Sequence, residues 1–365
     1  MSKGLKRGTF LDHGKYRIEK VLGSGGFGIT YLATDLGLER LRAIKEFFPK
    51  DYCDRDENTS HVTLGTSNTA EFVDRLKKKF IKEARNIANL DQHHGIITIH
   101  AVFEENNTAY YVKDYIEGES LSEMVKRNGP LEIDKALKYI TEVGYALEYV
   151  HEHNINHLDV KPANIMVRRK DDTPILIDFG LSKQYDSEGL QTSTTPTGIS
   201  HGYAPIEQYN DGGVREFSRQ TDVYSLAATL YFLVSGKTPP HATSLTQNDL
   251  TFPEGFPQSL ILPISKAMST KKQHRHKSIK EFINSLQPED EVTMIEVGTR
   301  NSLPQNTNNL KNEGFMHSKG VENASFRKKN VNIKNNNIKL DVGETVYIIF
   351  VIALLLSIII GLIIQ

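Results

Sequence analysis

The stretch that decides the fold reads HLDVKPAN over residues 157–164 and is followed by DFG over residues 178–180. It places Asp159, Lys161 and Asn164 on one short loop and directs Asp178 toward the same point. Phosphoryl transfer needs a carboxylate that orients a hydroxyl, a cation near the moving phosphate, and oxygen ligands for Mg²⁺. The order and spacing of these residues therefore predict a phosphoryl-transfer site.

Length, charge and cysteine content narrow the class of protein. The chain has 365 residues, enough for one large two-lobed domain or two ordinary ones. A net charge of −1 argues against binding through bulk positive charge, so we expect no nucleic-acid partner. Cys53 is the one cysteine, so no disulfide can form within the chain, as is typical of a reducing compartment.

A long apolar run lies near the C-terminus. Residues 346–364 carry no charged side chain, and a helix of this length, rising about 1.5 Å per residue, matches a bilayer core of about 30 Å. A buried core helix is the alternative. Basic residues precede the run, and the positive-inside rule keeps that side cytoplasmic. These residues are Arg327, Lys328, Lys329, Lys334 and Lys339. We expect a single-pass membrane protein whose folded domain is cytoplasmic.

Composition divides the rest of the chain. Residues 1–15 form a polar tail, and residues 16–286 are globular in pattern. The Asn- and Lys-rich linker over residues 287–345 cannot bury enough apolar surface to offset its ordering entropy, so we expect it to be disordered. Periodicity predicts strands over 16–22, 29–33, 41–47, 98–103 and 109–112, a helix from Ala70, and further helices over 121–127, 133–153, 222–235, 260–269 and 279–286. This order predicts an α+β domain with a small β-rich lobe before a larger helical lobe.

A glycine-rich turn lies between the first two predicted strands. A dinucleotide-binding turn is the alternative, but that turn opens into a helix, whereas the β-branched and aromatic residues 29–33 favour a strand. A glycine turn between strands can offer backbone N–H groups to nucleotide phosphates. The turn residues are Gly23, Ser24, Gly25, Gly26, Phe27 and Gly28.

Taken together, these motifs resemble those of the protein kinases. The stretches AIKEFFP over residues 43–49 and GYAPIEQY over residues 202–209 are similar to bacterial, eukaryotic-like (Hanks-type) serine/threonine kinases. The resemblance covers residues 16–286 and implies an N-lobe over 16–113, a hinge over 114–118 and a C-lobe over 119–286. It also implies ATP and Mg²⁺ as bound groups and protein substrates with serine or threonine acceptors. Homodimerisation through the membrane helix is open.

The resemblance assigns roles to the catalytic loop. Asp159 would orient the substrate hydroxyl, and Lys161 would stabilise charge on the transferred group. Asn164 and Asp178 would hold Mg²⁺. Ser200 takes the place of the family's substrate-loop threonine, where its hydroxyl could bond Asp159 and Lys161.

It assigns further roles in the N-lobe and hinge. Lys45 would hold the α- and β-phosphates and pair with Glu83 of the helix that starts near Ala70. Backbone groups of Asp114 and Ile116 would bond the adenine. Lys113 precedes the hinge, where the family usually has an apolar or small polar side chain. It either snorkels past the nucleotide pocket or alters the pocket behind the adenine.

Other positions carry structural expectations. By resemblance, Glu207 pairs with Arg275 in a buried bridge, and Asp222 braces the catalytic loop. Leu158 stands where the family has an arginine that grips a phosphorylated loop, so we expect activity that does not require phosphorylation within residues 180–205. The loop hydroxyls still open to autophosphorylation are Thr192, Ser193, Thr194, Thr195 and Thr197. Residues 49–69 exceed the usual spacing and predict a surface insertion.

An active protein kinase has one rival from a different class, a pseudokinase scaffold that binds nucleotide or partner proteins without transfer. Every catalytic side chain that the resemblance requires is present, which favours the enzyme. A small-molecule kinase of the same fold is less favoured, because the stretch around residues 200–209 resembles a loop built for a peptide.

Overall fold

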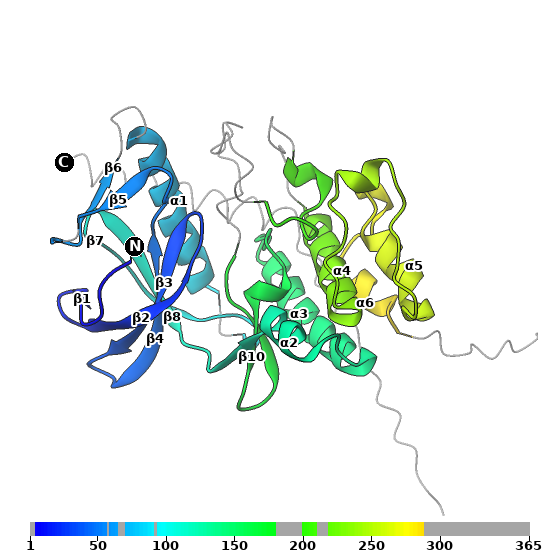
Figure 1. Cartoon of the computed structure of the whole chain (residues 1–365), viewed down its shortest axis with the longest axis horizontal. Helices are drawn as coiled ribbons and strands as arrows, with labels where there is room; N and C mark the ends of the chain where they lie inside the picture. The colour runs from blue at the N-terminus through cyan, green and yellow to red at the C-terminus, as the bar shows by residue number, and fades with distance from the viewer. Residues whose placement is uncertain are drawn as a thin grey trace, which may run out of the picture. The chain divides into compact units, whose positions relative to one another are not determined.

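The computed structural model describes residues 4–56, 58–64, 70–90, 93–179, 199–209 and 218–287. Within them, a six-stranded antiparallel sheet with strand order β1-β2-β3-β4-β8-β7 builds the first lobe (Figure 1). Its strands are β1 (Phe10–Leu11), β2 (Tyr16–Ser24), β3 (Gly28–Asp35), β4 (Arg40–Phe47), β7 (Ile99–Glu105) and β8 (Thr108–Asp114). The predicted strands of this lobe are confirmed.

One long helix packs on this sheet. Helix α1 (Ala70–Ala88) contacts β7 and β8 and buries one apolar stripe. The stripe follows the helical period, as expected for a helix with one face on a sheet. Its buried residues are Val73, Leu76, Ile81, Ala84 and Ile87. The helix predicted from Ala70 is thus confirmed, and it carries Glu83 toward the sheet.

Two segments pack more closely than their sequence indicates. The part of the predicted polar tail that the structure describes is folded: Leu11 is fully buried in β1, and the backbone N–H of Leu5 donates to the hydroxyl of Tyr31 at 3.1 Å. The predicted surface insertion contains a hairpin of β5 (Cys53–Arg55) and β6 (Val62–Leu64). Arg55 from this hairpin forms a buried ion pair with Glu46 at 2.6 Å, so the insertion is anchored to the lobe.

The second lobe is mainly helical. Its helices are α2 (Leu121–Asn128), α3 (Ile133–Glu152), α4 (Arg219–Ser235), α5 (Gln258–Ala267) and α6 (Ile279–Asn284). Helix α3 packs against both α4 and α6, and α4 is buried along most of its length (Figure 1). A small sheet of β9 (Gly118–Ser120), β10 (Ile165–Arg168) and β11 (Thr173–Leu176) lies beside these helices and carries the catalytic loop and the DFG segment on its strand ends.

Local signals explain where the helices begin and end. Ser120 caps α2 in a capping box with Glu123, in which each side chain binds the other residue's backbone N–H. Helix α4 ends at Gly236, whose φ of +68° is the left-handed conformation that glycine adopts without strain. The capping box fixes the start of α2 just after the predicted hinge. Gly236 fixes the end of the buried helix α4.

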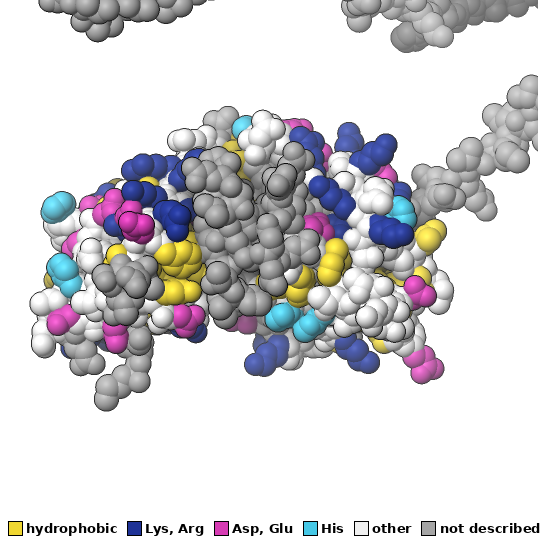
Figure 2. Space-filling view, turned by 90° about the horizontal axis from the view of Figure 1, so that it is seen from above, with side chains coloured by type: hydrophobic (Ala, Val, Ile, Leu, Met, Phe, Trp, Pro, Cys, Tyr) yellow, Lys and Arg dark blue, Asp and Glu magenta, His cyan; other side chains and the backbone are white. Residues whose placement is uncertain are grey.

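The surface mixes charges of both signs. Basic and acidic side chains lie next to one another over the described parts of the face in Figure 2. Among the described residues, no helix is long and apolar enough to cross a membrane. The predicted span over residues 346–364 and the linker from residue 288 lie outside the part of the chain that the structure describes.

Candidate active site

Three side chains meet at the catalytic loop. The hydroxyl of Ser200 donates to Oδ1 of Asp159 at 2.6 Å, and Nζ of Lys161 lies 2.8 Å from Oδ2 of the same carboxylate. Lys161 also donates to the Ser200 hydroxyl at 2.9 Å. The predicted contacts of Ser200 with Asp159 and Lys161 are confirmed. An aspartate that accepts a hydrogen bond from an alcohol beside a cation can orient an attacking hydroxyl.

Asn164 joins this group from the short 3-10 turn Pro162–Asn164. Its Nδ2 donates at 2.9 Å to both the backbone oxygen and Oδ2 of Asp159, and lies 3.4 Å from the backbone oxygen of Asp178. This orientation fixes the amide and leaves its carbonyl oxygen as a possible metal ligand. An amide oxygen and the Asp178 carboxylate form a hard oxygen donor set that suits Mg²⁺. The two predicted ligands therefore lie on neighbouring segments, and their oxygen donors are of the kind that Mg²⁺ prefers.

A buried aspartate holds the loop in shape. The carboxylate of Asp222 accepts 2.8 Å hydrogen bonds from the backbone N–H groups of His157 and Leu158 and lies 2.8 Å from Nε2 of His151. Burial would raise the pKa of Asp222, but its hydrogen bond with His151, the nearby histidines and the backbone N–H groups lower it. The predicted brace is confirmed, and it supports Leu158, whose φ of +63° is rare for a non-glycine residue.

Asp178 forms ion pairs with two lysines. Nζ of Lys45 lies 3.1 Å from Oδ2 of Asp178, and Nζ of Lys113 bonds Oδ1. Burial alone would raise the pKa of Asp178, but the charges of Lys113 and Lys45 outweigh it and hold that pKa below its ordinary value. Lys113 is therefore part of the site. Its charged end points at the DFG segment and donates to the backbone oxygen of Ile177 at 3.2 Å.

Glu83 differs from its implied role. The resemblance pairs it with Lys45, but among the described residues Lys45 forms its ion pair with Asp178, and the buried Oε1 of Glu83 has no hydrogen-bond partner. Burial raises the pKa of Glu83 to about 8, although the charges of Lys79 and Lys45 lower it in part. The reason for the difference is competition, because Asp178 holds the amine that Glu83 would need.

The predicted nucleotide-binding turn joins β2 to β3, so a strand and not a helix follows it. The turn closes with a 2.8 Å hydrogen bond from the N–H of Gly25 to the oxygen of Gly28. Gly28 has no room for a side chain, since a Cβ there would lie 2.5 Å from the backbone oxygen of Glu46. The turn is thereby held above β4, the strand that carries Lys45.

The hinge residues lie at the end of β8 and beyond it. The N–H of Asp114 donates to the oxygen of Thr98 at 3.1 Å, and its carboxylate contacts Arg42 at 2.5 Å and His100 at 2.7 Å. Ile116 is half-buried. These contacts fix the start of the hinge, and the adenine role of its backbone stays a prediction.

The substrate-loop support is built as predicted. Arg275 contacts the two oxygens of Glu207 at 2.7 Å and 2.9 Å, and its side chain is fully buried. The sequence did not indicate a further support, a buried 2.9 Å hydrogen bond from Nε2 of Gln208 to the backbone oxygen of Leu158. It ties the substrate loop directly to the catalytic loop. Gly180 and residues 181–198, with the predicted autophosphorylation hydroxyls, lie outside the described residues.

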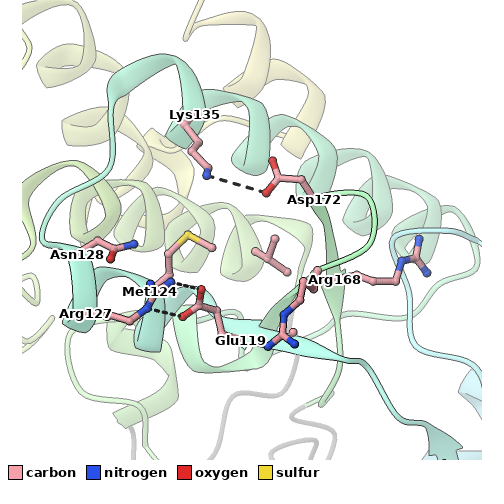
Figure 3. A pocket seen from close by; sticks show the side chains of 10 residues that line it. Glu119, Met124, Arg127, Asn128, Lys135, Arg168 and Asp172 are labelled. Carbon is pink, nitrogen blue, oxygen red and sulfur yellow. Dashed lines mark hydrogen bonds and ion pairs between the residues drawn. The ribbon is translucent and has the colours of Figure 1, made fainter.

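A separate cavity of about 490 Å³ lies between α2, α3 and the turn from β10 to β11 (Figure 3). Two of its basic side chains are matched by its two acidic ones: Arg127 pairs with Glu119 at 2.5 Å, and Lys135 lies 4.0 Å from Asp172. The other two basic side chains pair with acidic residues beside the cavity, Arg168 with Asp171 at 2.9 Å and Arg169 with Glu117 at 3.3 Å. Every basic side chain that lines the cavity therefore has an acidic partner, and nothing in its lining indicates a ligand.

This geometry defines a two-lobed kinase fold with a paired catalytic and metal-binding loop. The sequence pattern of the protein kinase domain matches residues 16–295, and the chain belongs to the protein kinase family. Serine/threonine-protein kinase PknA of Nostoc sp. is 30% identical over 287 residues, which are 75% of this chain and 47% of that protein. Serine/threonine-protein kinase PrkC of Bacillus subtilis is 29% identical over 280 residues, 74% of this chain and 39% of that protein.

A solved structure agrees with the fold. The apo form of PpkA-294 is 28% identical and has a TM-score of 0.67, covering 78% of this chain and all of that one. The chain spans about half the length of the curated relatives that it matches, with 47% of the Nostoc protein as one example. The likeness therefore concerns the kinase domain.

Proposed function

We propose that this chain is a serine/threonine protein kinase that transfers the γ-phosphate of ATP to hydroxyl groups of protein substrates. The observation that carries the proposal is the contact of the Asp159 carboxylate with both the Lys161 amine, at 2.8 Å, and the Ser200 hydroxyl, at 2.6 Å. The carboxylate is thus placed to accept a hydrogen bond from an alcohol, and a cation lies where negative charge on a transferred group needs stabilising.

Each residue of the site has a separate role in the proposed reaction. Asp159 orients the substrate hydroxyl and can take up its proton, and Lys161 supplies positive charge beside it. Asn164 and Asp178 would hold Mg²⁺, which when bound would offset the charge of the phosphates. Asp222 keeps the loop in the left-handed turn at Leu158 that aims Asp159. In-line positioning supplies much of the rate of phosphoryl transfer, so these supports matter to turnover.

The test uses labelled ATP. The chain is incubated with ATP labelled in the γ-phosphate, Mg²⁺ and a generic protein substrate, beside the Asp159→Asn variant. We expect label on serine and threonine with the wild-type chain and a large loss with the variant. Equal labelling by both would overturn the proposal. Nucleotide binding without labelling would instead support the pseudokinase alternative.

The proposal includes a tether to the cytoplasmic face of a membrane through residues 346–364. Its support is the uncharged apolar run and the basic residues that precede it. Extraction of membranes with alkaline carbonate tests this. We expect the whole chain to stay in the membrane pellet and a chain ending at residue 345 to be released. Release of both would contradict the tether.

A further inference from the structure

Lys113 has an unusual place for a lysine. It lies on β8 opposite Ala43 of β4, two residues after Tyr111, which is opposite Lys45. Alternate residues of a strand share a face, so Lys113 and Tyr111 point the same way, and Nζ of Lys113 lies 5.9 Å from the centre of the Tyr111 ring. The side chain is only 5% exposed. A buried lysine needs a partner, because a desolvated charge is costly.

The partner is the predicted metal ligand. Lys113 bonds Oδ1 of Asp178 and also donates to the backbone oxygen of Ile177 at 3.2 Å, so two contacts fix its amine. Lys45 occupies Oδ2 of the same carboxylate at 3.1 Å. Each carboxylate oxygen that could bind a metal therefore has an ammonium group on it. The resemblance accounts for the lysine at position 45 but not for the one at position 113.

The low exposure of Lys113 strengthens the electrostatic interactions of its charge. Water screens it little, so it acts on other charges at Asp178 more strongly than a surface lysine would. It repels a cation that approaches the carboxylate and attracts the phosphates of a nucleotide that arrives without a metal. The charge of Lys113 therefore opposes metal binding and favours the binding of a metal-free nucleotide.

We propose that Lys113 is a built-in counter-ion of Asp178, which competes with Mg²⁺ for this carboxylate and strengthens nucleotide binding when no metal is present. This inference rests on the proposed function, since it concerns the ATP and Mg²⁺ site. Lys113 acts on the metal through Asp178 and is a positioning residue. The rival explanation is that the lysine only fills space behind the hinge, and then its charge would not matter to either ligand.

The experiment measures binding at equilibrium, apart from turnover. The full chain is purified in detergent, and the affinity for ADP with a fluorescent label is measured in excess chelator and across a Mg²⁺ titration. A labelled nucleotide is needed because the chain has no tryptophan. The variants are Lys113→Met, which keeps much of the side-chain volume without the charge, and Lys113→Arg, which keeps the charge. Lys78→Met removes a charge from a lysine that is 74% exposed and serves as the control.

We expect Lys113→Met to weaken metal-free binding of ADP about tenfold, since one partly desolvated charge is removed. For the same reason, the Mg²⁺ concentration that gives half of the full change in ADP affinity should fall about tenfold. Lys113→Arg and Lys78→Met should resemble the wild type in both quantities. If Lys113→Met does not fold, as judged by its thermal transition, Lys113→Gln takes its place.

Two results would overturn the inference in distinguishable ways. Wild-type values for both quantities in Lys113→Met or Lys113→Gln would mean that the amine only fills space, while the proposed kinase function would stand. A wild-type chain that binds no nucleotide at any Mg²⁺ concentration would remove the proposed function and the inference with it.

Discussion

The hydroxyl of Ser200 donates a 2.6 Å hydrogen bond to Oδ1 of Asp159, although the two residues lie on separate loops. Lys161 contacts both partners, so the three side chains form a closed set. The set links the substrate loop to the proposed catalytic carboxylate.

We predict that Ser200→Ala lowers turnover about tenfold to hundredfold, because the loss of this contact lets Asp159 move from its oriented position. Ser200→Thr should keep most of the activity, since it retains the hydroxyl. Phosphate transfer at saturating ATP measures the effect. An alanine variant with wild-type turnover would show that the contact is not needed for catalysis.

The pair of Glu207 and Arg275 tests the substrate-loop support. The arginine side chain is fully buried and that of Glu207 is 12% exposed. Arg275→Met would leave a buried carboxylate unpaired and should lower the free energy of unfolding by about 3–5 kcal/mol. The double variant with Glu207→Gln should recover part of this loss.

The matched control is Arg127→Met, because Arg127 also pairs with a glutamate but is 63% exposed. It should change stability by less than about 1 kcal/mol. Thermal or denaturant unfolding of the four chains, including the wild type, provides the comparison. Similar losses in Arg275→Met and Arg127→Met would contradict the buried bridge as a major support.

Glu83 should make stability depend on pH. Its pKa in the folded chain is about 8, above the ordinary 4.5, because burial favours the neutral acid. Between these two values the unfolded chain has lost the proton and the folded chain retains it, so stability falls as pH rises through this window. Below the window Glu83 is neutral in both states and does not lower the free energy of unfolding. Above the window its buried charge lowers the free energy of unfolding to the full extent.

Glu83→Gln should therefore be more stable than the wild type at pH 8.5, and this advantage should shrink toward pH 5. Thermal unfolding of the nucleotide-free chain across this range measures it. Glu71→Gln, an exposed position at the start of the same helix, is the control and should follow the wild type. Parallel profiles for Glu83→Gln and the wild type would exclude a neutral Glu83.

The site was predictable where its residues are close in sequence. Asp159, Lys161 and Asn164 share one short loop, so their spacing alone indicated that they would meet, and the structure brings them together. The first-lobe strands and helices such as α1 and α3 follow clear periodicity, whereas the buried helix α4 does not. A local sequence pattern and a short separation in sequence are enough to predict these features.

Other features depend on contacts that no local pattern records. The sequence left the direction of Lys113 open, and its contact with Asp178 depends on how β8 approaches the DFG segment. Arg55 resembles a solvated charge in a polar insertion, yet it pairs with the buried Glu46. Leu11 belongs to a short polar stretch without periodicity, so its burial arises from pairing with strand β2 and from packing in the first-lobe core.

Leu158 leads to a prediction about regulation. Its side chain is fully buried, its N–H bonds Asp222 at 2.8 Å, and its backbone oxygen accepts from Gln208 at 2.9 Å. This position therefore offers no cation to a phosphorylated loop. We expect phosphatase-treated chain to keep most of its activity toward a protein substrate. Loss of most activity, with the removed phosphate mapped to residues 180–205, would contradict this.

The central claim is that the Asp159 carboxylate is needed for phosphate transfer, whereas other residues of the site bind the nucleotide. Its most direct measurement is the single-turnover rate of transfer at saturating ATP and Mg²⁺ for the wild type and Asp159→Asn, with nucleotide affinity measured in parallel. We predict a fall of about 10²–10⁴-fold in the rate with little change in affinity. Equal rates in the two chains would contradict the account.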